Sequence, residues 1–249
     1  MITVQNIVTF LQQKAPFETA EEWDNVGLLV GDATAEVSTV YVALDITDEV
    51  IDNALAVGAQ LIVSHHPVIF DPVKTMLANG IPYRLVKSDL SAVCMHTNLD
   101  KCQGGVNDTL AAALGLTDVQ IAPDGMCRIG RLPEPMTGEG FAKRCAAVLN
   151  TSVKMHVGTA DVQTVALCGG SGSELVLPLL EQADAALTAE IKHHEWLGLS
   201  PEKTVIDGGH FETEVGVAAV LTEWLQAEFP AITVVLGEQT PPYQTLIKD

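Results

Sequence analysis

The sequence predicts a layered α/β protein in two halves, with mainly parallel sheets. Short apolar, β-branched segments alternate with segments in which apolar residues recur at intervals of three and four. This alternation is typical of strand–helix–strand units, in which each helix returns the chain so that successive strands run parallel. A stretch rich in proline and glycine, residues 121–140, is the expected joint between the two halves.

The first half contains three predicted strands, each followed or preceded by a predicted helix. Strands are expected at 37–45, at 61–66 and at 91–100, the last of which runs into a loop. Helices are expected at 47–59, with Thr47 as N-cap, at 81–90, with Pro82 in the first turn, and at 105–116.

The second half repeats the same rhythm. Strands are expected at 162–170, 203–209 and 232–237. Helices are expected at 140–150, 173–183, 187–198 and 212–229.

Composition and charge limit the class of protein. The chain of 249 residues is 47% hydrophobic and 18% charged, which is enough to bury one large or two small cores. Its net charge of −19, from 32 acidic and 13 basic residues, repels phosphate backbones. Nucleic acid is therefore an unlikely partner.

The cysteines and the N-terminus indicate a cytoplasmic protein. The five cysteines are scattered without C-x-x-C spacing, so neither a disulfide framework nor a zinc ribbon is expected. The N-terminal residues lack a signal-peptide pattern, and no apolar run approaches the ~18 residues that span a bilayer. We expect no membrane association.

Polar residues that could take part in ligand binding lie at the ends of three of the predicted strands. They are His65 and His66, then His96, Asn98 and Asp100, then Asp207 and His210. The carboxyl ends of parallel strands form the crevice in which α/β proteins bind ligands. Pro67 ends the strand, so both adjacent rings can face this crevice and serve two ions. The alternative is one histidine hydrogen-bonded in the core and one on the surface.

The stretch DGGHFETE, residues 207–214, adds to this pattern. His210 and Glu214 are four residues apart and would share one face of a helix that begins after the two glycines. A solvated helix face is the alternative. Together with Asp100 these residues provide enough nitrogen and oxygen ligands for two divalent ions, which could be zinc, manganese or iron.

Six blocks of the sequence carry a family resemblance. They are WDNVGLLVGD (23–32), SHHPVIF (64–70), MHTNLD (95–100), GGVNDTLA (104–111), CGGSG (168–172) and DGGHFETE (207–214). In this order they resemble the NIF-three-like family of dinuclear-metal hexameric proteins, whose members are often labelled GTP cyclohydrolase I type 2 homologues. The resemblance implies a ring-shaped homohexamer of two-lobed subunits, with a two-metal site between the lobes.

The resemblance also implies residue roles. His65 and His66 would bind the two ions, Asp100 one of them and His210 the other, and Glu214 would bridge them. We expect residues 1–120 with 205–249 to form a first lobe that carries the ligands, and 121–204 to form a second, smaller lobe.

Three further residues are weaker candidates. His96 lies four residues before Asp100 and is a candidate catalytic proton donor or substrate contact, with a supporting or structural role as the alternative. Asp24 and Asn25 are candidate substrate contacts, or simply part of a turn after a helix in the N-terminal segment that precedes them.

These observations predict a metal-dependent hydrolase of GTP cyclohydrolase I type 2 type. Two divalent ions would lower the pKa of bound water, and the resulting hydroxide would attack a small molecule such as a nucleotide. The alternative is a hexameric metal-binding scaffold that binds a protein partner and has no turnover of its own. An open coordination position would favour the enzyme, and a closed structural site the scaffold.

Overall fold

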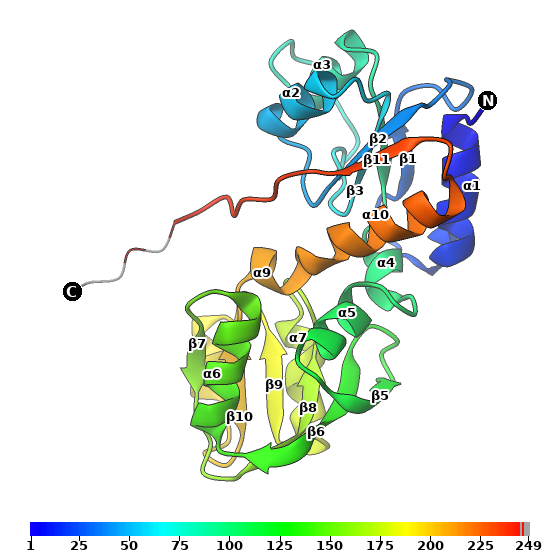
Figure 1. The fold of residues 1–249 in the computed structure, drawn as a ribbon. Helices are drawn as coiled ribbons and strands as arrows, with labels where there is room; N and C mark the ends of the chain where they lie inside the picture. Colours follow the sequence, from blue (N-terminus) through cyan, green and yellow to red (C-terminus); the bar gives the residue numbers. More distant parts are fainter. Residues whose placement is uncertain (245, 247–249) are drawn as a thin grey trace. The chain divides into compact units, whose positions relative to one another are not determined.

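The computed structural model describes residues 1–244 and 246 and contains two compact units (Figure 1). The first unit comprises residues 1–105 and 217–239. Among the described residues, the second comprises 106–216, 240–244 and 246. Helices and strands are interleaved in both units, so the predicted α/β class is confirmed.

A five-stranded sheet forms the centre of the first unit. Its strands are β1 (Gly27–Val30), β2 (Thr39–Ala43), β3 (Leu61–Ser64), β4 (Ser91–Cys94) and β11 (Thr233–Leu236). Their order is β1-β4-β3-β2-β11, and all neighbouring pairs are parallel except the antiparallel pair of β1 and β4. Every residue of β3 and β4 is buried, as expected for central strands covered on both faces.

Two of the helices of the first unit begin directly after a threonine that caps them. The helices of this unit are α1 (Val4–Lys14), the 3₁₀ turn η1 (Phe17–Thr19), α2 (Asp48–Ala56), α3 (Ile81–Lys87), α4 (Thr97–Lys101) and most of α10 (Gly216–Glu228). The Thr47 side chain accepts a hydrogen bond from the backbone of Val50, which confirms it as the N-cap of α2. Pro82 lies in the first turn of α3, where no intrahelical donor is lost.

A six-stranded mixed sheet forms the centre of the second unit. Its strands are β5 (Thr117–Ile121), β6 (Arg128–Met136), β7 (Lys154–His156), β8 (Val162–Leu167), β9 (Ala185–Thr188) and β10 (Thr204–Asp207). The order is β5-β6-β8-β9-β10-β7. Only β8, β9 and β10 are parallel to one another, whereas β5, β6 and β7 pair antiparallel.

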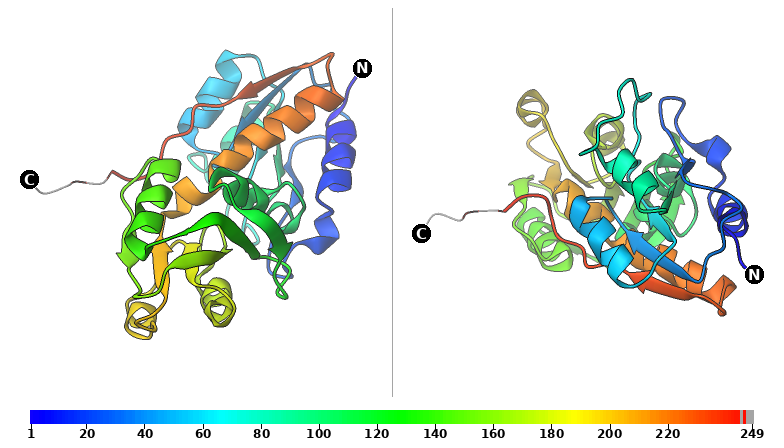
Figure 2. Two further views of the ribbon diagram at one scale, coloured as in Figure 1. Left: turned by 60° about the horizontal axis from the view of Figure 1, so that its bottom comes forward. Right: turned by 90° about the horizontal axis from the view of Figure 1, so that it is seen from above.

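Helices cover both faces of this sheet, as the two further views also show (Figure 2). The helices of this unit are α5 (Val106–Ala113), α6 (Gly138–Leu149), α7 (Ser173–Val176), η2 (Leu177–Glu181), α8 (His193–Leu197) and α9 (His210–Glu214). Successive strand residues point to opposite faces: Leu187 packs with α5 and α6, whereas Ala186 packs with α7 and η2.

The structure corrects several element predictions. Residues 187–198 were expected to be helical, but the segment begins inside β9 and only His193–Leu197 is helical. The expected joint at 121–140 contains β6, which lies inside the second sheet. The single helix expected at 212–229 is two helices, α9 and α10. In the first case tertiary burial overrides local helix propensity, because all four residues of β9 are buried.

The unit boundaries also lie elsewhere than expected. Strand β10 pairs with β9 and β7, which assigns residues 205–216, and with them His210 and Glu214, to the second unit. Helix α5 packs in the core of the second unit, so residues 106–120 belong there too. Residues 245 and 247–249 of the expected first lobe lie outside the described residues.

Across residues 1–244, no helix has both the length and the apolar character that a membrane crossing needs.

Candidate metal centre

The register of the first sheet brings three strand ends together. Ala43 pairs with Ser64, and Ser64 pairs with Cys94, so β2, β3 and β4 end at the same edge. The residues that follow these ends are Asp45, then His65 and His66, then His96. Their convergence follows directly from parallel pairing in register.

Three histidines of the first unit form a compact cluster at this edge. One ring nitrogen from each of His65, His66 and His96 lies within 4.8 Å of the others. The ring centroids of His65 and His66 are 4.9 Å apart, and that of His96 lies 5.2 Å and 5.6 Å from them. The backbone explains the orientation of the adjacent pair, because β3 ends at Ser64, directly before His65, and Pro67 directly follows His66.

Each ring in this cluster is oriented through Nδ1. His65 Nδ1 lies 2.8 Å from the carbonyl oxygen of Met95, which can only accept a hydrogen bond. His66 Nδ1 lies 2.7 Å from Asp45 Oδ1, and His96 Nδ1 lies 2.8 Å from Asp24 Oδ1. These acceptors place the proton of each neutral ring on Nδ1 and the lone pair on Nε2, the tautomer that a metal-binding histidine uses.

The Asp24 carboxylate is held by several donors. It accepts hydrogen bonds from His96, from the backbone of Thr97 at 3.0 Å and from the Thr97 hydroxyl at 2.5 Å. Burial raises the pKa of Asp24, but the hydrogen bonds from His96 and Thr97 outweigh it and lower the pKa to about 2. Asp24 is therefore ionised at neutral pH and fixes the ring of His96.

Asp100 lies beside His65. The sequence predicted a loop here, but Thr97–Lys101 form the short helix α4, with His96 at its N-cap. Because Asp100 follows His96 by about one helical turn, its side chain lies near the histidines, and its Oδ1 is 3.6 Å from His65 Nε2. The first unit thus presents three imidazoles and a carboxylate at one strand edge.

In the second unit, the ends of β9 and β10 position a second group. Thr188 pairs with Asp207, so both strands end at the same edge. Gly209 has a φ of 85°, which glycine adopts without strain, and the turn there starts α9 at His210. His210 Nε2 lies 3.1 Å from Glu214 Oε2, which confirms that the two residues share one helix face.

Glu190, which follows β9, orients His210. Its Oε1 lies 3.0 Å from His210 Nδ1, so Nδ1 donates and Nε2 carries the lone pair when the ring is neutral. Two electron-rich atoms, His210 Nε2 and Glu214 Oε2, then lie 3.1 Å apart, and this proximity is favourable only with a proton or a cation beside them. Glu190 has a φ of 56°, a backbone conformation that is uncommon for a residue with a side chain.

Gly170 makes room for the Glu214 carboxylate. A Cβ atom at this position would lie 2.1 Å from Glu214 Oε1 and 3.2 Å from His210 Nε2, and the φ of Gly170 is 60°. The backbone amides of the CGGSG block are bonded within the unit: Gly170 donates to Thr213 and Gly172 to Thr188. The block therefore shapes the space around the two candidate ligands.

Glu212, between the two candidate ligands, is held by other partners. The Tyr243 hydroxyl donates a hydrogen bond of 2.5 Å to Glu212 Oε2, and Thr151 donates one of 3.3 Å to Oε1. Burial and the Glu212 carboxylate raise the pKa of Tyr243. These hydrogen bonds hold Glu212, and with it the first turn of α9, in place within the second unit.

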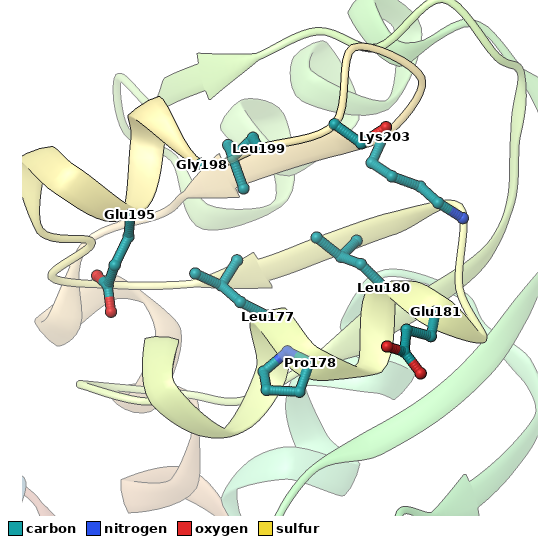
Figure 3. Close-up of a pocket in the computed structure, with 9 residues that line it drawn as sticks. Leu177, Pro178, Leu180, Glu181, Glu195, Gly198, Leu199 and Lys203 are labelled. Atoms are coloured by element: carbon teal, nitrogen blue, oxygen red, sulfur yellow. The ribbon is translucent and has the colours of Figure 1, made fainter.

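A separate hollow of about 420 Å³ lies near the helices α8 and η2 (Figure 3). Its lining includes Leu177, Pro178, Leu180, Glu181, Leu199 and Lys203. No histidine or aspartate is among its lining residues within the part of the chain that the structure describes. This hollow is therefore distinct in its chemistry from the histidine-rich strand ends.

Fold and side chains together define a class of protein: a two-sheet α/β protein with histidine and carboxylate groups capable of binding metal at its strand ends. The chain belongs to the Duf34/NIF3 (NGG1p interacting factor 3) family, whose model matches residues 2–242.

Relatives and solved structures agree with this family. A Streptomyces coelicolor protein named GTP cyclohydrolase 1 type 2 homolog is 35% identical over 235 residues, which are 86% of this chain and 82% of that protein. A Staphylococcus aureus protein of the same name is 46% identical over 121 residues, 47% of this chain and only 33% of the relative. The crystal structure of a hypothetical protein from Staphylococcus aureus matches with a TM-score of 0.89 and 32% identity, covering 98% of this chain and 99% of that one.

The structure places the predicted residues in two groups. His65, His66, His96 and Asp100 gather in the first unit. His210 and Glu214 form a pair in the second unit. Asp24 contacts His96 and Thr97, and the Asn25 amide donates to the carbonyl of Ile69 at 2.6 Å. Sequence reasoning missed Asp45, although its position as the last residue of a predicted strand was a usable signal.

Proposed function

We propose that this protein is a metal-dependent hydrolase with a centre of two divalent ions, acting on a small molecule such as a nucleotide. The observation that carries the proposal is the orientation of the histidines. Acceptors at Nδ1 of His65, His66 and His210 set the tautomer that directs Nε2 to a cation. An acceptor at Nδ1 of a histidine is also the usual arrangement around metal-binding histidines in proteins.

The donor atoms fit zinc, manganese or iron. The first unit supplies His65, His66 and Asp100, which are imidazole and carboxylate ligands without a thiolate. The second unit supplies His210 and Glu214. Because two protein ligands are fewer than most bound zinc or iron ions use, we propose that both sets contribute to one dinuclear centre, as the family resemblance implies.

Divalent ions in such a cage supply Lewis acidity, which makes water a nucleophile near neutral pH. Within the chain, His96 is the residue suited to carry a proton. The ionised Asp24 holds its Nδ1–H, so proton exchange with a substrate is confined to Nε2. The relatives' shared name, GTP cyclohydrolase 1 type 2 homolog, supports a ring-opening hydrolysis of a nucleotide.

Metal content and turnover of three variants test the proposal. The wild type should hold two ions per chain and hydrolyse GTP or a simple phosphoester. Glu214→Ala should lose metal and turnover together. His96→Gln should keep both ions and lose at least about 100-fold in turnover, the usual contribution of a positioned acid or base. His194→Gln, which changes an exposed histidine on α8, is the matched control.

Two results would contradict the proposal. A metal-replete wild type that is inert towards nucleotides and phosphoesters would favour the metal-binding scaffold. A His96→Gln variant that loses metal would make His96 a ligand and not a proton carrier. Light scattering on the same samples tests the proposed homohexamer.

A further inference from the structure

An exposed aromatic pair stands beside the histidine cluster of the first unit. Trp23 is 59% exposed and Phe70 is 50% exposed. Their ring centroids are 5.7 Å apart, with the ring planes tilted by 37°. Single exposed apolar residues are common on protein surfaces and need no explanation. Two large aromatic rings in contact with each other beside a polar cluster form an apolar patch, and such patches often mark binding sites.

Both rings lie close to His96. The centroid of the Trp23 ring is 6.1 Å from that of His96, and the centroid of Phe70 is 6.4 Å from it. Both approach the imidazole edge-on, at an interplanar angle of 73°. An aromatic molecule in contact with Trp23 and Phe70 would therefore lie next to His96.

Polar bonds on both sides hold the pair in place. Asp24, next to Trp23, is tied to His96 and to Thr97. Asn25 donates to the carbonyl of Ile69, the residue before Phe70, at 2.6 Å. These bonds join the two segments that carry the rings, so the aromatic surface is formed before any ligand arrives and little ordering entropy is lost on binding.

We propose that Trp23 and Phe70 form the binding surface for a planar aromatic heterocycle, and that Asp24 and Asn25 are positioning residues for it. The two aromatic rings can bind such a molecule by stacking. Stacking depends on the flat π-face of the ligand and not on its charge, so the strongly acidic character of the protein does not oppose it. This inference deepens and rests on the proposed function, because it names the chemical class that the same site would bind.

Ligand affinity, measured separately from turnover, tests the inference. Guanosine and nicotinamide are titrated into the purified protein by calorimetry, with D-ribose as the non-aromatic probe. Trp23→Leu and Phe70→Leu should each weaken binding of the aromatic probes about tenfold, and Trp23→Phe should restore most of it. Tyr83→Leu, which removes another partly exposed aromatic ring of the first unit, is the matched control and should bind as the wild type does.

Three outcomes would overturn the inference: no binding of either aromatic probe to the wild type, equal weakening in Tyr83→Leu, or a change in oligomeric state when Trp23 or Phe70 is replaced. The last would show that the pair is a contact between copies of the chain. Metal content in every variant separates the two proposals. Retained probe binding in metal-depleted Glu214→Ala, with no turnover by any sample, would refute the hydrolase and leave the aromatic surface standing.

Discussion

Replacing Asp24 by asparagine should destabilise the first unit by an amount that depends on pH. The side chain of Asp24 is fully buried and accepts bonds from His96 and Thr97. Asparagine keeps the shape of the side chain but carries no charge, and its amide NH₂ group would face another donor. The lowering of the pKa from 3.8 to about 2 corresponds to a stabilisation of about 2 kcal/mol by the ionised carboxylate.

The pH window follows from the direction of this shift. Above about pH 5 the carboxyl group is ionised in both the folded and the unfolded chain, and the stabilisation is fully present. As the pH falls, the unfolded chain takes up the proton first, so about 1 kcal/mol remains at pH 3 and the contribution vanishes below about pH 2.

Urea unfolding at pH 7 and at pH 3 measures both values. Asp24→Asn should lower the free energy of unfolding by about 2 kcal/mol at pH 7 and by about half as much at pH 3. Glu22→Gln, which removes an exposed carboxylate two residues away, is the control and should stay within about 0.5 kcal/mol of the wild type. A loss that is equal at both pH values would refute the assigned role of the charge.

Two further changes test the surroundings of the candidate ligands. Gly170→Ala should displace the Glu214 carboxylate and reduce bound metal, whereas Gly125→Ala, at a φ of 77° with open space around it, should cost only about 1 kcal/mol of stability and no metal. Metal analysis and thermal unfolding of both variants check this, and equal metal in both would contradict it. Asp45→Asn should weaken metal binding about 10- to 100-fold in chelator competition, because Asp45 orients His66; an unchanged affinity would exclude that role.

Most of the site could be predicted from the sequence where residue type and strand position coincide. His65 and His66 directly follow a buried strand, and the spacing of His210 and Glu214 places them on one helix face. By contrast, the sequence of the CGGSG block does not indicate what the block does. Its role in making room for Glu214 depends on a close approach between residues 44 positions apart, which no local pattern encodes.

In the fold, too, some elements could be predicted from local sequence and others could not. Strands β2, β3 and β8 were predictable because many of their side chains are apolar and β-branched, which is the composition typical of strands in the interior of a covered sheet. Strand β9 has the alanine-rich sequence Ala185–Thr188, which has little intrinsic strand preference. It is a strand because β8 and β10 pair with it on both sides.

The alternation of helices and strands and the chemistry of the strand ends could be predicted from residue order alone, because hydrophobic periodicity and residue type are local properties. The acceptor that orients each histidine ring, by contrast, depends on the folded arrangement of the chain. Asp45 is 21 residues from His66, and Asp24 is 72 residues from His96. These pairs meet because strands far apart in the chain share one edge of a sheet, and sheet register is fixed by the packing of the whole unit.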